Sequence, residues 1–230
     1  VEPTPLRFYW LEQMLTYYEQ EYGEEMPVDV WNIHVHILPE GSYDQGSGTY
    51  NTEAGAGVPV GIGFDYQTGQ PELPREYLYT ECASAAIFKQ MVEDFRQWMY
   101  DQGEGDKELI ISEMGVLEPS IYIVKGGSEA ERKERGDQAI EEYMVEVFDW
   151  LLTTTDAEIG CPTDENRLVQ RWLWFSLNGS FWDQYTNRRG FNSSLYDYQT
   201  KDPTRFGRRF IAYQNEHYLT EGLYLPLVTK

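Results

Sequence analysis

Apolar and polar residues alternate in blocks along the chain, and each block has the spacing of one type of element. Residues 6–22, LRFYWLEQMLTYYEQEY, place apolar side chains at helical intervals, with Pro5 before them and Gly23 directly after. The next block, VDVWNIHVHIL at residues 28–38, alternates strongly and is rich in β-branched residues, as strands are. The pattern therefore predicts a helix followed by a strand.

The same pair of elements recurs further along the chain, and the last one is a helix. The predicted segments are, in order, a helix at 83–101, a strand at 107–117, a helix at 128–152, a strand at 167–179 and a helix at 205–218. Strands that alternate with helices imply right-handed βαβ units and a parallel sheet.

A sheet of only three parallel strands would leave two exposed edges, whereas a barrel removes its edges by closing. A complete eightfold barrel needs about 250 residues, and the first predicted helix has no strand before it. The sequence thus predicts a single α/β domain over residues 1–230, with a long insertion at about 40–80. Its parallel β/α units would form the C-terminal part of a TIM barrel. A self-sufficient half-barrel and a small open α/β sheet are the alternatives.

Charge limits the partners that this domain can have. The formal net charge of -21 at pH 7 repels nucleic acid and anionic membrane surfaces, so neither is expected as a partner. A neutral substrate meets no such repulsion. No apolar run approaches the roughly 20 residues of a membrane span. Cys82 and Cys161 are the only cysteines, so one disulfide is possible and no framework can be inferred.

The sequence indicates the cellular location of the protein less clearly than its charge limits its partners. The first residues, Val-Glu-Pro-Thr-Pro, lack the basic and apolar regions of a signal peptide and contain no Met, as in a processed or excerpted chain. Asn-x-Ser sequons begin at Asn178 and Asn192; they fit secretion but arise easily by chance. An extracellular or cell-surface location is the expectation that follows.

Polar residues gather toward the C-terminal ends of the predicted strands. Alternation places His34 and His36 on one face of the first strand, opposite its aliphatic residues. In the second strand, Glu113 is predicted to share a face with Leu109 and Ile111. The C-terminal ends of parallel barrel strands carry the active site, because the βα loops open there. These side chains are therefore candidates for one common site.

The third strand adds aromatic residues to this end. Trp172, Trp174 and Asn178 share a predicted face there, opposite Leu173 and Phe175. Taken singly, a Glu at a strand end is more often a solvated carboxylate, and a His is more often a satisfied core group. Three strands with the same polarity make those ordinary explanations less adequate.

Several of these segments resemble one enzyme family. ELIISEMG resembles the seventh-strand motif of the retaining glycoside hydrolases of the large (β/α)8 clan, in which an aliphatic strand ends in Glu before a small or apolar residue and Gly. VDVWNIHVHIL is similar to their sixth strand, and WLWFSLNG resembles the eighth, with its sugar-stacking Trp. SLYD and TRFG resemble the stretch that closes such domains. The resemblance covers residue 28 to about 213 and depends on the order and spacing of these motifs.

The resemblance implies a glycoside hydrolase that acts on a polysaccharide or glycoside. Glu113 would be the nucleophile of a retaining mechanism, and Trp174 would stack on the sugar ring. The implied substrate-binding residues are His34, His36, Trp172, Trp174 and Asn178. Carbohydrate is the implied partner, and neither a cofactor nor a metal is implied.

Retaining hydrolysis needs a second carboxyl group about 5–5.5 Å from the nucleophile. In the clan this acid/base is a Glu that follows Asn at the end of the fourth strand. Asn215-Glu216 is the matching dipeptide here, and it lies in the predicted last helix. The acid/base is therefore expected upstream of residue 1, in a missing N-terminal barrel half. Self-association through the exposed sheet edges is a further possibility.

Two other functions remain open on the sequence. The chain can be a non-catalytic carbohydrate-binding barrel fragment, in which Glu113 only accepts hydrogen bonds. Alternatively, His34 and His36 form a metal pair, as in amidohydrolase-type barrels, because two imidazoles on one face can share an ion. The second alternative lacks supporting ligands, since the only other histidine is His217.

Overall fold

The computed structural model describes residue 3 and residues 5–37, 42–44, 49–51, 64–65, 70–71, 79–179 and 191–221. Its helices are α1 (Pro5–Tyr22), α2 (Ala85–Asp101), α3 (Ser120–Ile123), α4 (Glu129–Thr153) and α5 (Arg205–Glu221). Short 3-10 turns are η1 (Tyr79–Glu81) and η2 (Pro162–Asp164). The strands are β1 (Val30–Val35), β2 (Ser42–Asp44), β3 (Thr49–Asn51), β4 (Phe64–Asp65), β5 (Gln70–Pro71), β6 (Glu108–Met114) and β7 (Arg171–Trp174).

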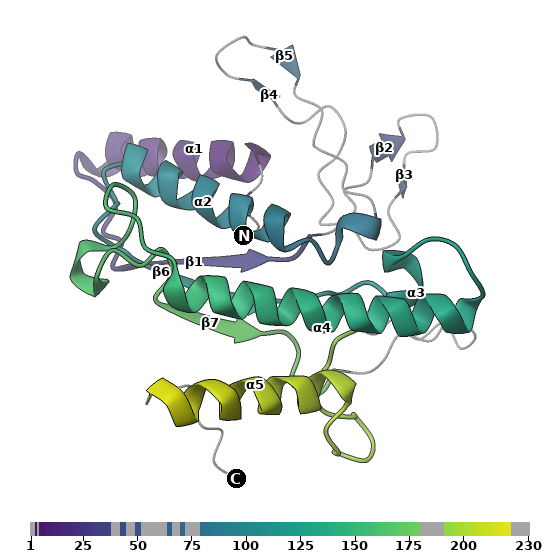
Figure 1. The fold of residues 1–230 in the computed structure, drawn as a ribbon. Helices are drawn as coiled ribbons and strands as arrows, with labels where there is room; N and C mark the ends of the chain where they lie inside the picture. Colours follow the sequence, from purple (N-terminus) through teal and green to yellow (C-terminus); the bar gives the residue numbers. More distant parts are fainter. Residues whose placement is uncertain are drawn as a thin grey trace.

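The main sheet contains β1, β6 and β7, all parallel, with β6 in the centre. Figure 1 shows α2 and α4 side by side in front of this sheet, with α1 next to α2 and α5 next to α4. The α/β class and the three adjacent parallel strands are thus as predicted. Within the described ranges the sheet stays at three strands and does not close, so the barrel remains a prediction.

The core lies between the sheet and its helices. Ile33 and Val35 of β1 and Leu109 and Ile111 of β6 are each 0% exposed on the side that faces the helices. Apolar residues at helical spacing meet them from the helix layer. They include Phe88, Phe95 and Met99 of α2 and Ile140, Met144 and Phe148 of α4. Burial on this side fixes which face of the sheet is left for function.

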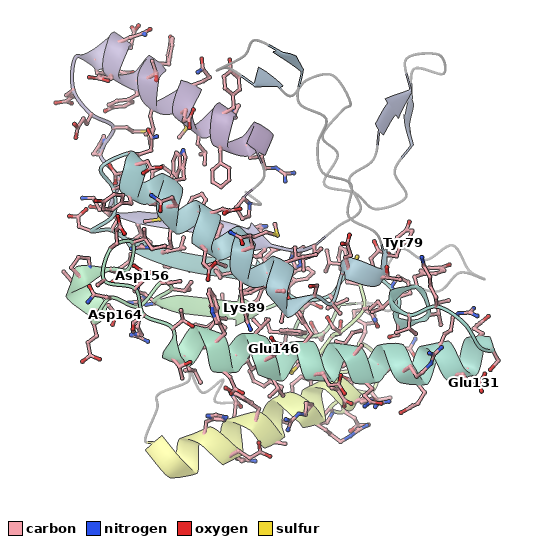
Figure 2. The ribbon with its side chains drawn as sticks, turned by 45° about the horizontal axis from the view of Figure 1, so that its top comes forward. Tyr79, Lys89, Glu131, Glu146, Asp156 and Asp164 are labelled. Atoms are coloured by element: carbon pink, nitrogen blue, oxygen red, sulfur yellow. The ribbon has the colours of Figure 1, made fainter. Side chains whose placement is uncertain are left out.

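Side-chain caps set where the two covering helices begin. The Ser84 hydroxyl accepts a hydrogen bond from the Ile87 N–H at the start of α2. At the start of α4, Ser128 and Glu131 form a reciprocal capping box. The hydrogen bond from the Ser128 N–H, followed by that from its hydroxyl, lowers the pKa of Glu131. Figure 2 shows Glu131 at the end of α4 that is distant from Asp156.

An ion pair also joins the two covering helices. Lys89 Nζ of α2 lies 2.7 Å from Glu146 Oε1 of α4, and both residues are labelled in Figure 2. Below this pair the rings of Phe88 and Tyr143 meet edge to face, with centroids 6.1 Å apart. Because an exposed ion pair contributes only about 0–1 kcal/mol, ring packing is the larger contribution to this contact.

The other face of the main sheet has no described helix against it. Asn32 and Arg171 are exposed there, and two apolar side chains, Val30 and Leu173, are 41% and 53% exposed. A parallel sheet is normally covered on both faces. Among the described residues, this face and the two outer edges, on β1 and β7, have no further strand or helix against them.

The two cysteines do not pair, and no disulfide joins Cys82 to Cys161. Both are buried. Burial, and then the charges of Glu118 and Glu81, raise the pKa of the Cys82 thiol far above its ordinary value. None of the described helices is both long and apolar enough to cross a membrane. The predicted insertion at about 40–80 falls mostly outside the described residues.

Candidate functional site

Glu113 faces the same side of the sheet as His34 because β6 contains one extra residue. The register pairs Ile33 with Ile111 and then His34 with Glu113, so Ser112 has no partner of its own in β1. Such a bulge shifts the alternation by one position and turns the following side chain to the opposite face. A regular strand would have placed Glu113 among the helices.

The predicted face of Glu113 was therefore wrong. Leu109 and Ile111 are 0% exposed against the helices, whereas the Glu113 side chain is 35% exposed on the other side of the sheet. Asn32 stabilises the bulge, because its Oδ1 accepts a hydrogen bond from the Ser112 N–H at 3.3 Å. Alternation alone cannot reveal a single inserted residue.

Two imidazoles converge on one oxygen of Glu113. His34 Nδ1 lies 3.5 Å from Oε2, and His36 Nε2 lies 3.6 Å from the same atom. The His34 side chain is 38% exposed and that of His36 only 3%. Among the described residues, no hydrogen bond or ion pair reaches Oε1 of Glu113. Within the described part of the chain, the contacts of this carboxylate are therefore made through Oε2.

His36 is fixed from two further directions. Its Nδ1 lies 3.2 Å from the Gly115 carbonyl oxygen. The imidazole and the Phe175 ring form a T-shaped contact, with centroids 5.7 Å apart. These contacts come from the ends of β6 and β7, so the site joins all three strands of the sheet. These two contacts fix the orientation of the imidazole, so that its Nε2 faces Glu113.

The backbone at position 115, directly after Glu113 and Met114, requires a glycine. Its φ is +152°, and a Cβ there would lie 2.5 Å from the Phe175 carbonyl oxygen. The Phe175 N–H donates to the Met114 carbonyl at 2.7 Å, which brings the two strand ends together. The peptide bond between Phe175 and Ser176 is cis. Any residue with a side chain at position 115 would separate β6 from β7 beside His36.

The third strand presents the opposite face from the one predicted. Trp174 is 9% exposed, and its ring packs on Phe148 and Tyr143 of α4, with centroids 5.7 Å and 6.3 Å away. Its Nε1–H donates to the Ser193 carbonyl at 2.9 Å. Trp172 is half-buried and packs against the same core. Both tryptophans therefore stabilise the fold, and the stacking role expected for Trp174 is not carried forward.

Phe175 is an aromatic residue near the site that the sequence pattern did not indicate. It is half-buried on the side of His36, and its ring lies 5.1 Å from that of Phe191, which is 43% exposed. Alternation from a core Trp174 would have found it. Asn178 is exposed in the loop after β7, and the described contacts do not bring it to Glu113.

A metal at this position has no support from the described residues. They contain no group of three or more His, Cys, Asp or Glu placed to hold a metal ion. The third histidine, His217, is on α5, where it stacks on Tyr213 with centroids 4.0 Å apart and lies 3.6 Å from Asp149 Oδ1. Although Glu113 lies beside both His34 and His36, the metal-pair interpretation of the two histidines thus gains no support from the described residues.

The arrangement can perform one kind of chemistry directly. A carboxylate held through one oxygen can attack an electrophilic carbon through the other or accept a hydrogen bond. The Phe175 ring contacts the His36 imidazole, and the Phe191 ring contacts Phe175. No protein-family model, curated protein or solved structure matches this chain. What the site does is therefore inferred from its residues and geometry.

Proposed function

We propose that this chain is a glycoside hydrolase-like domain that acts on a polysaccharide or glycoside, with Glu113 as the nucleophile of a retaining mechanism. The observation that supports it most is the convergence of His34 and His36 on Oε2 of Glu113, at 3.5 Å and 3.6 Å. This convergence lies at the carboxyl ends of adjacent parallel strands, where the active sites of β/α barrels lie.

In the proposed reaction, Oε1 of Glu113 attacks the anomeric carbon of the sugar. The bond from that carbon to the leaving oxygen breaks, the leaving oxygen takes a proton from an acid, and a neutral glycosyl ester forms on Glu113. The conjugate base of that acid then takes a proton from a water molecule, the water oxygen bonds to the anomeric carbon, and the bond to Glu113 breaks, which restores the carboxylate and the acid with retained configuration. The imidazoles on Oε2 keep Oε1 directed at the sugar.

The proposal requires a second carboxyl group about 5–5.5 Å away. We assign it to further parallel β/α units that would complete a barrel against the uncovered face and the outer edges of β1 and β7. Val30 and Leu173, at 41% and 53% exposed, are the kind of side chain that such units would bury. The same units would place the acid/base opposite Glu113.

Phe175 and Phe191 take the place of Trp174 as the proposed aromatic surface for the sugar. Their rings lie 5.1 Å apart at centroids, and Phe175 is next to His36. Sugar rings have apolar C–H faces that pack on aromatic rings. The sugar would then lie between this surface and Oε1 of Glu113.

A non-catalytic carbohydrate-binding domain is the second candidate. The observation in its favour is that Glu113 and the two phenylalanines can bind a sugar without any acid/base. The two candidates differ in one property, which is whether a covalent bond forms between Glu113 and the sugar.

The experiment is covalent trapping with dinitrophenyl 2-deoxy-2-fluoro-β-glycosides of several sugars. Their leaving group needs little protonation, so the ester can form without the second carboxyl group, and the fluorine slows its hydrolysis. We expect a mass increase on the peptide that contains Glu113. Glu113→Gln should take no label, and Glu108→Gln, the same change at the other end of β6, should label like the parent chain.

Two results would count against the proposal. A label on any residue other than Glu113 removes it as the nucleophile. Binding of the glycosides without labelling, measured by protein-observed NMR, favours the non-catalytic candidate. Where labelling succeeds, the anomer released on slow hydrolysis should have the configuration of the substrate.

A further inference from the structure

The hydrogen positions on His36 follow from its neighbours. Nδ1 lies 3.2 Å from the Gly115 carbonyl oxygen, and a carbonyl oxygen can only accept a hydrogen bond. Nδ1 must therefore carry a hydrogen. In a neutral ring the other nitrogen, Nε2, then has a lone pair and no hydrogen.

That lone pair would point at a negative charge. Nε2 of His36 is 3.6 Å from Oε2 of Glu113, and the His36 side chain is only 3% exposed. A lone pair facing a carboxylate oxygen is repulsive, and solvent screens the repulsion weakly at a buried group. A second proton on Nε2 replaces this repulsion by an ion pair with a hydrogen between the two atoms.

We propose that His36 is a positioning residue for Glu113 and that it does this as an imidazolium, with hydrogens on both ring nitrogens, through neutral pH. The inference deepens the proposed function and rests on it for its catalytic meaning. Burial alone would favour the neutral ring, but the adjacent carboxylate favours the charged one, and the pair together carries no net charge.

The other groups around the pair agree with this assignment. From β1, His34 approaches the same Oε2 at 3.5 Å, and its side chain is 38% exposed, so solvent screens its interaction with the pair. From β6, the charged neighbour is Glu113 itself. From β7, Phe175 presents a ring that cannot ionise. Among the described residues, His36 is thus the buried member of a group of two imidazoles and one carboxylate.

The imidazolium gives the site a proton that moves with the reaction. When Oε1 of Glu113 forms the glycosyl ester, the carboxylate charge disappears and His36 loses its counter-charge. The ring then releases the Nε2 proton to solvent and takes one back when water restores the carboxylate. Its charge in the resting site attracts Oε2 of Glu113 and so fixes the position of the carboxylate for attack.

The experiment reads the ring nitrogens directly and needs no turnover. The full chain is labelled with ¹⁵N-histidine and titrated by NMR from about pH 5 to about pH 9, with His34→Asn and His217→Asn used to assign the signals. We expect both His36 nitrogens to be protonated near neutral pH. As the pH rises, Nε2 should lose its proton while Nδ1 keeps its own.

The matched pair Glu113→Gln and Glu108→Gln isolates the cause. Removing the Glu113 charge should lower the midpoint of the His36 titration by about 1–3 pH units, and Glu108→Gln should leave it where it is. A neutral His36 at pH 7 in the parent chain, or a deprotonated ring with its hydrogen on Nε2, overturns the proposal. An unchanged midpoint in Glu113→Gln does the same.

Two safeguards keep the result decisive. If Glu113→Gln does not fold, the protonation and the tautomer of His36 in the parent chain still decide the question. Failure of this inference is also distinct from failure of the proposed function. Covalent labelling of Glu113 beside a neutral His36 contradicts only the imidazolium, whereas an imidazolium without labelling contradicts only the hydrolase.

Discussion

The two ends of the sheet each hold a charged side chain, and they hold it differently. At the end where β6 and β7 start, Arg96 of α2 is 0% exposed. It donates to the carbonyls of Ile159, Gly105 and Lys107 in the loops before these strands, at 2.6 Å, 3.0 Å and 3.0 Å. At the opposite end, the Glu113 side chain is 35% exposed and its neighbours are two imidazoles.

The difference separates a structural charge from a chemical one. Burial lowers the pKa of Arg96, but guanidinium stays protonated in proteins, and its carbonyl acceptors do not change with pH. Arg96 thus joins two loops permanently. The neighbours of Glu113 are two imidazoles, which are titratable groups, and among the described residues both of them contact the same oxygen, Oε2. A charge held by fixed dipoles stabilises the fold, whereas one held by titratable groups is suited to reaction.

The largest effect should come from removing the structural charge. Arg96→Met keeps the aliphatic part of the side chain but leaves three part-buried carbonyls without this donor. We expect the free energy of unfolding to fall by about 3–5 kcal/mol, measured by urea denaturation. The Glu113 label should persist in whatever fraction stays folded.

Arg135→Met is the matched control for this change. Arg135 also donates to two backbone carbonyls, those of Lys125 and Gly126, but it lies on the surface. Its loss should cost less than about 1 kcal/mol, because water can replace the donor. Equal losses for the two variants would show that burial does not explain the role of Arg96.

A pair of aromatic substitutions should separate fold from site on β7 and its continuation. Trp174→Phe removes a buried hydrogen bond to Ser193 and some ring volume, so it should cost about 2 kcal/mol of stability and leave sugar labelling unchanged. Phe175→Leu should cost less than about 1.5 kcal/mol but weaken glycoside binding about three- to tenfold. Unfolding curves and labelling rates are measured on both variants. If Trp174 were the ring that stacks on the sugar, Trp174→Phe would weaken labelling and Phe175→Leu would not.

The smallest expected effect is the dependence of stability on low pH through Asp156. Asp156, labelled in Figure 2, accepts hydrogen bonds from the N–H groups of Glu158 and Ile159, and these lower its pKa below the ordinary 3.8. A lowered folded-state pKa gives stability that is complete above the unfolded value and lost as pH falls through the folded one.

Asp156→Ala should therefore lower the free energy of unfolding by a constant amount between about pH 5 and pH 7. Below about pH 4 the difference from the parent chain should narrow, because the parent loses the same contribution. Denaturation curves across this range test it. A difference that widens in acid would mean that Asp156 does not act through its charge.

The order of the elements was predictable because apolar periodicity is local. The helix at Pro5–Tyr22 and the strand at Val30–Val35 fall within the predicted segments or differ from them by one residue at an end. The third strand is shorter than predicted and begins at Arg171. Before it, the Gln170 side chain accepts the Leu109 N–H at 2.7 Å, a long-range contact that no local pattern reveals.

The candidate site was predictable only in part. Polarity at the strand ends correctly brought His34, His36 and Glu113 together, although their roles remain proposals. The side of β7 was misassigned because Trp is typical of both cores and sugar sites, and only packing on α4 places Trp174 in the core. Phe175 was missed because alternation places it on the opposite face from Trp174, and that face was assigned to the core.

The bulge at Ser112 makes the site depend on the number of residues as much as on their identity. A deletion of Ser112 would keep every candidate site residue yet restore regular pairing, and Glu113 would then turn into the apolar layer beneath α2 and α4. An unpaired carboxylate is costly in that layer. In related chains, the spacing between the aliphatic run and the Glu-Met-Gly triplet is therefore a stricter marker of this site than similarity of sequence. A gap of one position in an alignment would remove the site without changing any of its residues.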